Sequence, residues 1–147
     1  MFDLDLLLAI AHHLIVFSLV AIVFVEFVNV RRGMDAATVR RVGAIDAWYG
    51  ILAGLILLIG FGRAIFAAKG WDYYSHDLFF WAKIVTFAVI GLLSIPPTLS
   101  YLKWRRAVAA PTDAAVANVR RYLWLEVMLF APLLAFAAAM ARGYGLF

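Results

Sequence analysis

Four residues that could bind a ligand lie inside apolar runs of the sequence. His12 and His13 lie in the first run, Arg63 lies near the end of the second, and Lys83 lies near the start of the third. At 1.5 Å of rise per residue, His12, Arg63 and Lys83 are all about 8–9 Å from the same end of a helical bundle. Neutral imidazole binds metals and haem iron, and basic side chains bind carboxylates. The pattern therefore predicts a pocket for an anionic ligand.

The surroundings of these residues leave alternatives open. Arg142 ends the fourth run close to the same surface, and His76 and Lys69 lie near it as well. Alternatively, Arg63 and Lys83 each extend a long side chain to the lipid head groups. The two adjacent histidines are about 100° apart on a helix, so they cannot both face one ligand. The sequence does not decide which of them faces inward, or whether that one is a ligand or a packing residue.

Three acidic residues, Glu26, Asp46 and Glu126, lie in the opposite half of the runs. An ionisable side chain in hydrocarbon costs at least about 2.5–3.5 kcal/mol, so each one needs a partner or a function. We expect ion pairs with nearby arginines at the level of the head groups, and a proton relay is the alternative. The nearest arginines are Arg31, Arg41 and Arg121.

The composition predicts that the chain lies in a bilayer. Of its 147 residues, 67% are hydrophobic and 15% are charged, and the mean hydropathy is +0.96. Soluble domains are about 45–50% apolar, and a particle of 16.4 kDa has too little interior to bury the excess. The composition excludes a cytosolic enzyme and a disordered chain, and the absence of cysteine excludes thiolate metal sites and disulfides.

Four apolar runs have the length of about 20 residues that crosses the hydrocarbon of a bilayer. Each is expected to be a helix, because backbone polar groups in lipid must be satisfied within the segment. Residues 1–147 should therefore form one all-α domain, a bundle of four transmembrane helices. The first run lacks the basic leader and cleavage site of a signal peptide, so we expect it to be retained. The predicted spans are 6–28, 44–68, 78–102 and 122–141.

The basic residues predict the orientation of the bundle. Loops 29–43 and 103–121 hold nine of the thirteen Lys and Arg residues, and the positive-inside rule makes both loops cytoplasmic. Both termini and loop 69–77 should then lie outside. Because the arginines flank helix ends, we expect no binding of nucleic acid. The nine residues are Arg31, Arg32, Arg40, Arg41, Lys103, Arg105, Arg106, Arg120 and Arg121.

Two helical patterns predict contacts inside the bundle. Gly50 and Gly54 have the small-xxx-small spacing that lets helices pack closely. One face of the third run carries a stripe that should face either a ligand or the packed interior, and Pro96 and Pro97 should kink this helix. The stripe consists of Lys83, Phe87, Ile90, Ser94, Pro97 and Tyr101.

The order of several segments resembles an uncharacterised family of small bacterial four-helix membrane proteins over nearly the whole chain. These segments are AHHL (11–14), GFGRAIFAAKGWDYY (60–74), FFWAKI (79–84) and RRYLWLEVMLFAPLLAFAAAMARG (120–143). More distantly, the sequence is similar to the HemJ-type protoporphyrinogen oxidases, which carry an essential His in helix 1, a Lys that opens a later helix, and Arg, Glu and Pro in the last helix. The corresponding residues here are His12 or His13, Lys83, Arg121, Glu126 and Pro132.

This resemblance implies haem b inside the bundle, with His12 or His13 on the iron. Lys83 would be a second ligand or a partner of a haem carboxylate, with Arg63 and Arg142 beside the other carboxylates. The protein would then be an oxidoreductase of the bacterial inner membrane that transfers electrons to quinone. The competing hypothesis is a non-enzymatic subunit that assembles into a larger membrane complex or a homo-oligomer. A transporter is disfavoured, because the sequence has no inverted repeat.

Overall fold

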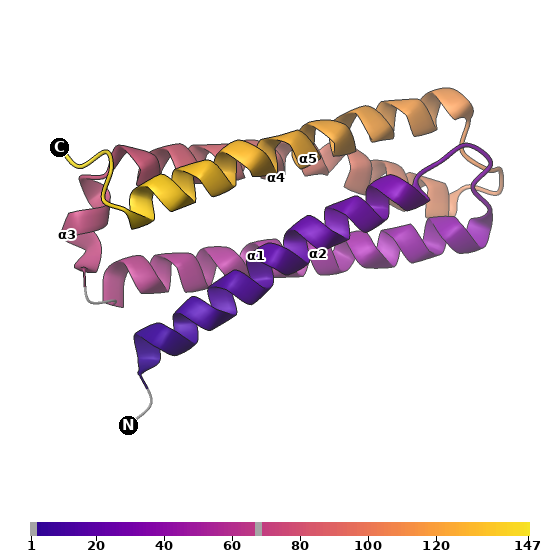
Figure 1. Cartoon of the computed structure of the whole chain (residues 1–147). Helices are drawn as coiled ribbons and strands as arrows, with labels where there is room; N and C mark the ends of the chain where they lie inside the picture. The colour runs from indigo at the N-terminus through magenta and orange to yellow at the C-terminus, as the bar shows by residue number, and fades with distance from the viewer. Residues whose placement is uncertain (1–2, 67–68) are drawn as a thin grey trace.

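The computed structural model describes residues 3–66 and 69–147, and most of them are helical. Figure 1 shows the long helices side by side, with the short α3 (Gly70–Ser75), the start of the first helix and the C-terminus at the same end of the bundle. This arrangement confirms the all-α fold and the four predicted spans. The helices are α1 (Leu4–Asn29), α2 (Ala36–Phe66), α3 (Gly70–Ser75), α4 (Leu78–Arg106) and α5 (Asp113–Ala141).

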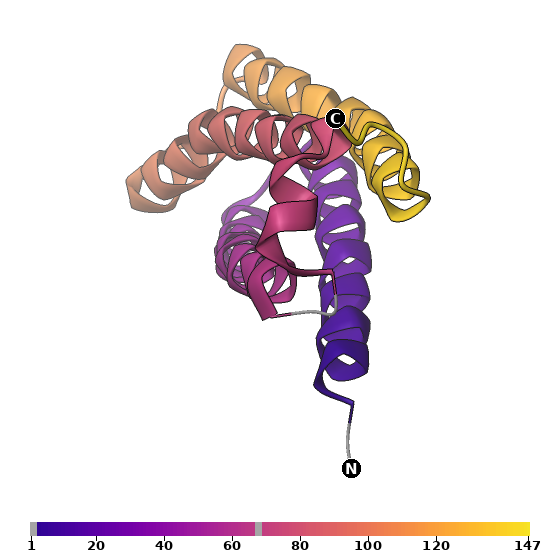
Figure 2. The same ribbon diagram turned by 90° about the vertical axis from the view of Figure 1, so that its left-hand side faces the viewer.

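The long helices form two antiparallel hairpins. Helix α1 packs on α2 and α4 packs on α5, and the hairpins meet through contacts of α2 with α4 and of α1 with α5. In Figure 2 the α1–α2 pair lies below the α4–α5 pair. Within the described residues, no backbone contacts join α1 to α4 or α2 to α5, so these two pairs lie diagonally across the bundle. We call the end with the α1–α2 and α4–α5 loops the arginine-rich end, and the other the terminal end.

The helices are longer than the predicted spans, because they continue from the apolar runs into polar sequence. Helix α2 begins eight residues before the predicted span, and the Asp35 side chain accepts a hydrogen bond from the backbone N of Thr38 there (2.8 Å). Hydrogen bonds from Thr38 also lower the pKa of the Asp35 carboxyl, which keeps it charged at a helix start. Thr112 caps α5 in the same way. Residues 67–68 of the second predicted span lie outside the described residues.

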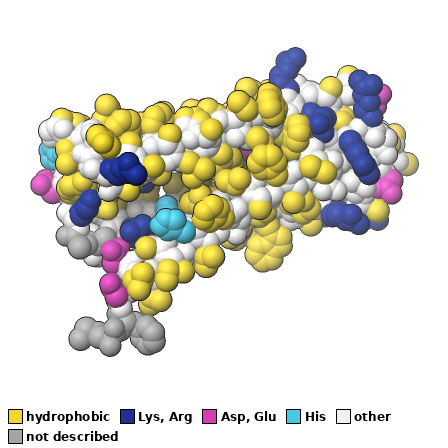
Figure 3. Space-filling view, viewed as in Figure 1, with side chains coloured by type: hydrophobic (Ala, Val, Ile, Leu, Met, Phe, Trp, Pro, Cys, Tyr) yellow, Lys and Arg dark blue, Asp and Glu magenta, His cyan; other side chains and the backbone are white. Residues whose placement is uncertain are grey.

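The outward faces of the four long helices are apolar, as contact with lipid tails requires. Leu14, Phe17, Leu58 and Leu92 are 64–74% exposed, and Figure 3 shows an almost continuous hydrophobic surface between the charged ends. Each long helix is long and apolar enough to cross a membrane. The protein therefore has the architecture of a multi-pass membrane protein.

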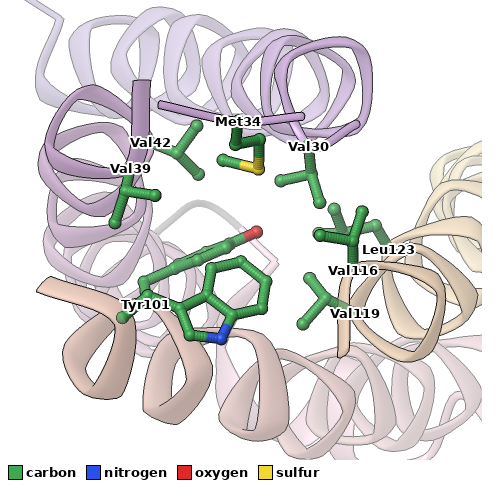
Figure 4. Packing of buried hydrophobic residues seen from close by; sticks show 9 residues of the cluster. Val30, Met34, Val39, Val42, Tyr101, Val116, Val119 and Leu123 are labelled. Carbon is green, nitrogen blue, oxygen red and sulfur yellow. The ribbon is translucent and has the colours of Figure 1, made fainter. Parts of the chain in front are cut away.

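Two clusters of buried apolar side chains fill the bundle. Figure 4 shows the one near the arginine-rich end, where valines and Met34 surround the ring of Tyr101. Arg120 closes the bundle at this end by donating hydrogen bonds to the carbonyls of Phe27 and Val30, at the end of α1. The second cluster lies nearer the terminal end and consists of Ile15, Leu19, Val23, Tyr49, Ile56, Ile90, Phe130 and Leu133.

The two patterns predicted for the interior have different outcomes. The stripe on α4 faces inward, since Ile90, Pro97 and Tyr101 are buried, and the helix assignment continues through both prolines. The expectation for Gly50 and Gly54 is wrong within this chain. Both lie on the exposed face of α2, and a Cβ atom at either position would have no neighbour within 4 Å.

The C-terminal segment is held by backbone hydrogen bonds at the start of α4, beside Asp77. The side chain of Asp77 is fully buried, and its Oδ1 accepts hydrogen bonds from the backbone N of Phe79 (2.8 Å) and Phe80 (3.3 Å). The backbone N of Leu78 donates to the carbonyl of Gly145 at 2.9 Å. One carboxyl group therefore caps the helix beside the point where the chain end is held.

Replacing Asp77 by alanine should lower the free energy of unfolding by about 1 kcal/mol, the usual cost of losing a helix cap. Asp77→Asn should cost less, because its amide oxygen accepts the same hydrogen bonds. Unfolding of the detergent-solubilised protein by sodium dodecyl sulfate measures both variants. Equal losses for the two variants would mean that the negative charge, rather than the cap, stabilises this junction.

Candidate functional site

A cleft opens between the long helices near the terminal end. It consists of two adjoining cavities, an apolar inner one of about 80 Å³ and an outer one of about 390 Å³. The outer cavity alone falls within the range of about 300–1,000 Å³ that is typical of ligand pockets. Figure 3 shows a hollow in this part of the surface with histidine and basic side chains around it. The cavities share His12, Gly60, Phe80, Lys83 and Ala137.

His12 is the histidine that faces the bundle. It borders both cavities, and its Nδ1 is buried without a hydrogen-bond partner. Gly60 of α2 faces this ring, since a Cβ atom there would make an ordinary contact, 3.5 Å from Cε1 of His12. His13 is exposed, borders the outer cavity alone, and places Nδ1 2.7 Å from the carbonyl oxygen of Ala9. The structure thus separates two histidines that the sequence left equivalent.

The predicted basic residues Arg63 and Lys83 meet at the cleft. Both border the outer cavity. Nε of Arg63 lies 3.4 Å from Oδ1 of Asp5, and Nζ of Lys83 lies 3.6 Å from Sδ of Met140. Arg142 does not join them, because it is an exposed residue at the end of α5 and is not part of either cavity wall.

Several residues that the sequence analysis did not single out also line the outer cavity. Asp5 precedes His12 by seven residues, or two helical turns, so the two side chains share one face of α1. Met140 continues a series of α5 residues spaced by three or four positions that begins at Glu126. Both spacings are visible in the sequence and could have predicted these positions. The additional lining residues are Asp5, Tyr74 and Met140, and Lys69, which the sequence already placed near this surface, lines the cavity with them.

The three acids of the other half do not form the predicted ion pairs with arginines. Glu26 and Glu126 are each 1% exposed and Asp46 is 7% exposed, whereas the nearby arginines are exposed. Arg41 and Arg121 are each five positions from their acids, which places them about 140° away around the helix, and Arg31 lies beyond the end of α1. Hydroxyl groups bind the acids instead. Tyr101 Oη donates to Glu26 (3.2 Å), Thr98 Oγ1 donates to Asp46 (2.9 Å), and Tyr49 Oη donates to Glu126 (3.2 Å).

The comparisons with known proteins give one family. A family described as "Predicted membrane protein (DUF2214)" matches residues 4–145. No curated protein matches the chain, and no solved structure matches it. The matched region contains the cleft and the buried acids Glu26, Asp46 and Glu126.

Proposed function

This chain belongs to the family of predicted membrane proteins designated DUF2214, and from that premise we propose that it binds haem b in the cleft and takes part in electron transfer. The observation that carries the proposal is the position of His12. Its imidazole lies between an apolar and a cationic cavity, and one ring nitrogen is buried without a partner. A buried polar atom without a partner is costly in a folded protein, so it favours a ligand role for this ring.

The residues around the cleft fit such a group. Apolar side chains such as Leu19, Ile56 and Phe130 line the inner cavity and would keep water from the buried side of the His12 ring. Lys69 and Arg63 border the outer cavity and would neutralise carboxylates at its edge. Haem b would supply one-electron chemistry when bound. The protein would hold the iron through His12, orient the carboxylates and limit access.

The membrane setting supports quinone as the electron acceptor. The outward faces of the helices are apolar, so a lipid-soluble quinone could reach the cleft from the bilayer. We propose the bacterial inner membrane as the location, with the arginine-rich end in the cytoplasm, because the positive-inside rule favours that orientation. Oxidation of a tetrapyrrole is the related activity that the cleft would suit.

An absorption spectrum tests the proposal directly. We expect the protein, purified in mild detergent from cells supplied with a haem precursor, to show a Soret band that shifts when dithionite reduces it. Protein purified without haem should bind added haemin with the same spectrum. A colourless preparation that also fails to take up haemin would contradict haem binding and would favour a non-enzymatic subunit of a larger complex.

A further inference from the structure

The buried acids Glu26, Asp46 and Glu126 lie one after another along the axis of the bundle. We call this arrangement the ladder, and each acid with its hydroxyl partner is one rung. Asp46 and Tyr49 are three residues apart on α2, and Thr98 and Tyr101 are three residues apart on α4. Three residues of helix rise by about 4.5 Å. Because α2 and α4 run in opposite directions, three levels follow one another from the arginine-rich end. They are Tyr101 with Glu26, then Asp46 with Thr98, then Tyr49 with Glu126.

Two rungs of the ladder cross the centre of the bundle. Tyr101 of α4 reaches Glu26 of α1, and Tyr49 of α2 reaches Glu126 of α5. These are the two diagonal helix pairs, which have no backbone contacts in the described part of the chain. Figure 4 shows the Tyr101 hydroxyl pointing into the middle of the packed side chains. The acids therefore lie where the four helices converge, buried away from lipid.

The surroundings of the acids favour a bound proton over a bound cation. Oε1 of Glu26 and Oε1 of Glu126 are buried without a hydrogen-bond partner. No Lys or Arg side chain of the described residues forms an ion pair with any of the three acids. Nor do three acidic or histidine side chains among those residues converge to hold a metal ion. A carboxylate in this setting would be desolvated and would have a hydroxyl group but no positive charge as its partner, whereas a protonated carboxyl is neutral.

The last rung, Tyr49 with Glu126, lies close to the inner cavity of the cleft. Phe130 borders the inner cavity and follows Glu126 by four residues, about 6 Å of rise. Ile56 borders the same cavity and packs in one cluster with Tyr49. The ladder thus extends from the core near the arginine-rich end toward the cleft, and three residues of helix, about 4.5 Å of rise, separate one level from the next.

We infer that Glu26, Asp46 and Glu126 form a proton-binding site that stores protons in the core and passes them along the axis toward the cleft. Each transfer moves one proton from a carboxyl O–H to a neighbouring carboxylate, and the donor is then reprotonated from the next acid. Tyr101, Thr98 and Tyr49 hold the carboxyls in place. The storage of protons does not depend on haem binding, whereas the use of these protons in a redox step at the cleft rests on the proposed function.

Infrared spectroscopy of the protein reconstituted in lipid vesicles tests this inference. At neutral pH we expect absorption from protonated carboxyl groups that shifts when H2O is replaced by D2O. Glu26→Gln and Glu126→Gln should each remove part of that absorption, whereas Asp113→Asn, which changes an exposed acid, should leave it unchanged. Should Glu126→Gln fail to fold, Tyr49→Phe keeps the acid and should shift its absorption instead.

Three outcomes would overturn the inference. The first is the absence of protonated carboxyl absorption at neutral pH, since the acids would then be ionised. The second is an absorption that neither glutamine variant alters. The third is an absorption that fails to shift in D2O while the protein stays folded, because protons that do not exchange cannot be passed on. The measurement needs no haem, so its result is separate from the absorption test of the proposed function.

Discussion

His12→Ala is expected to abolish the haem absorption of the purified protein, whereas His13→Ala is expected to keep it. The two residues are adjacent, equally close to the terminal end, and identical in chemistry. They differ in orientation, because only His12 borders the inner cavity and has a buried ring nitrogen without a partner. Removing the His12 imidazole would leave the iron of a bound haem without its protein ligand. Haem content per protein, measured by absorbance after purification, checks both variants.

Exogenous imidazole is the control that separates a missing ligand from a damaged fold. Truncating His12 leaves a space beside Gly60 that a free imidazole fits, so added imidazole should restore the Soret band of His12→Ala. Retention of haem by His12→Ala, combined with its loss from His13→Ala, would assign the ligand to the exposed ring. Loss in both variants without rescue by imidazole would show that His12 supports the structure of the cleft but does not bind iron.

The spans and the level of the site follow from the sequence, because both depend on length and hydropathy along a single helix. Apolar runs of about 20 residues locate the helices, and the position of His12, Arg63 and Lys83 within their runs gives the level at which they meet. Arg142 shows the limit of that argument. It is two residues beyond Met140, about 200° further around α5, so a residue at the correct level points away from the cleft.

The buried acids show what depends on tertiary structure. Proximity along the sequence predicted arginine partners for Glu26 and Glu126, but neighbours on a helix are three or four positions apart rather than five. Their actual partners, Tyr101 and Tyr49, lie 75 and 77 positions away. These residues come close only because the two helical hairpins pack so that α1 lies across the bundle axis from α4, and α2 lies across it from α5. A pattern confined to one helix carries no information about such contacts.

We expect Gly60→Phe to block the cleft without changing the residue at position 12. Gly60 borders both cavities, and a Cβ atom there already reaches ordinary contact distance from the His12 ring. Gly60→Ala should therefore be tolerated, whereas an aromatic ring must enter the cavity or displace His12. Overpacking of this kind costs about 1–3 kcal/mol, equivalent to haem affinity about five- to 150-fold weaker. Titration of the haem-free protein with haemin measures the change.

Gly62→Phe is the matched control, because it makes the same substitution within the same turn of α2. A Cβ atom at Gly62 has no neighbour within 4 Å, and Gly62 borders neither cavity. Both variants change helix propensity equally, so a difference in haem affinity between them arises from the cleft alone. If Gly60→Phe bound haemin as tightly as Gly62→Phe, haem would have to bind elsewhere. His12 would then be a packing residue, and the cationic outer cavity would lose its assigned ligand.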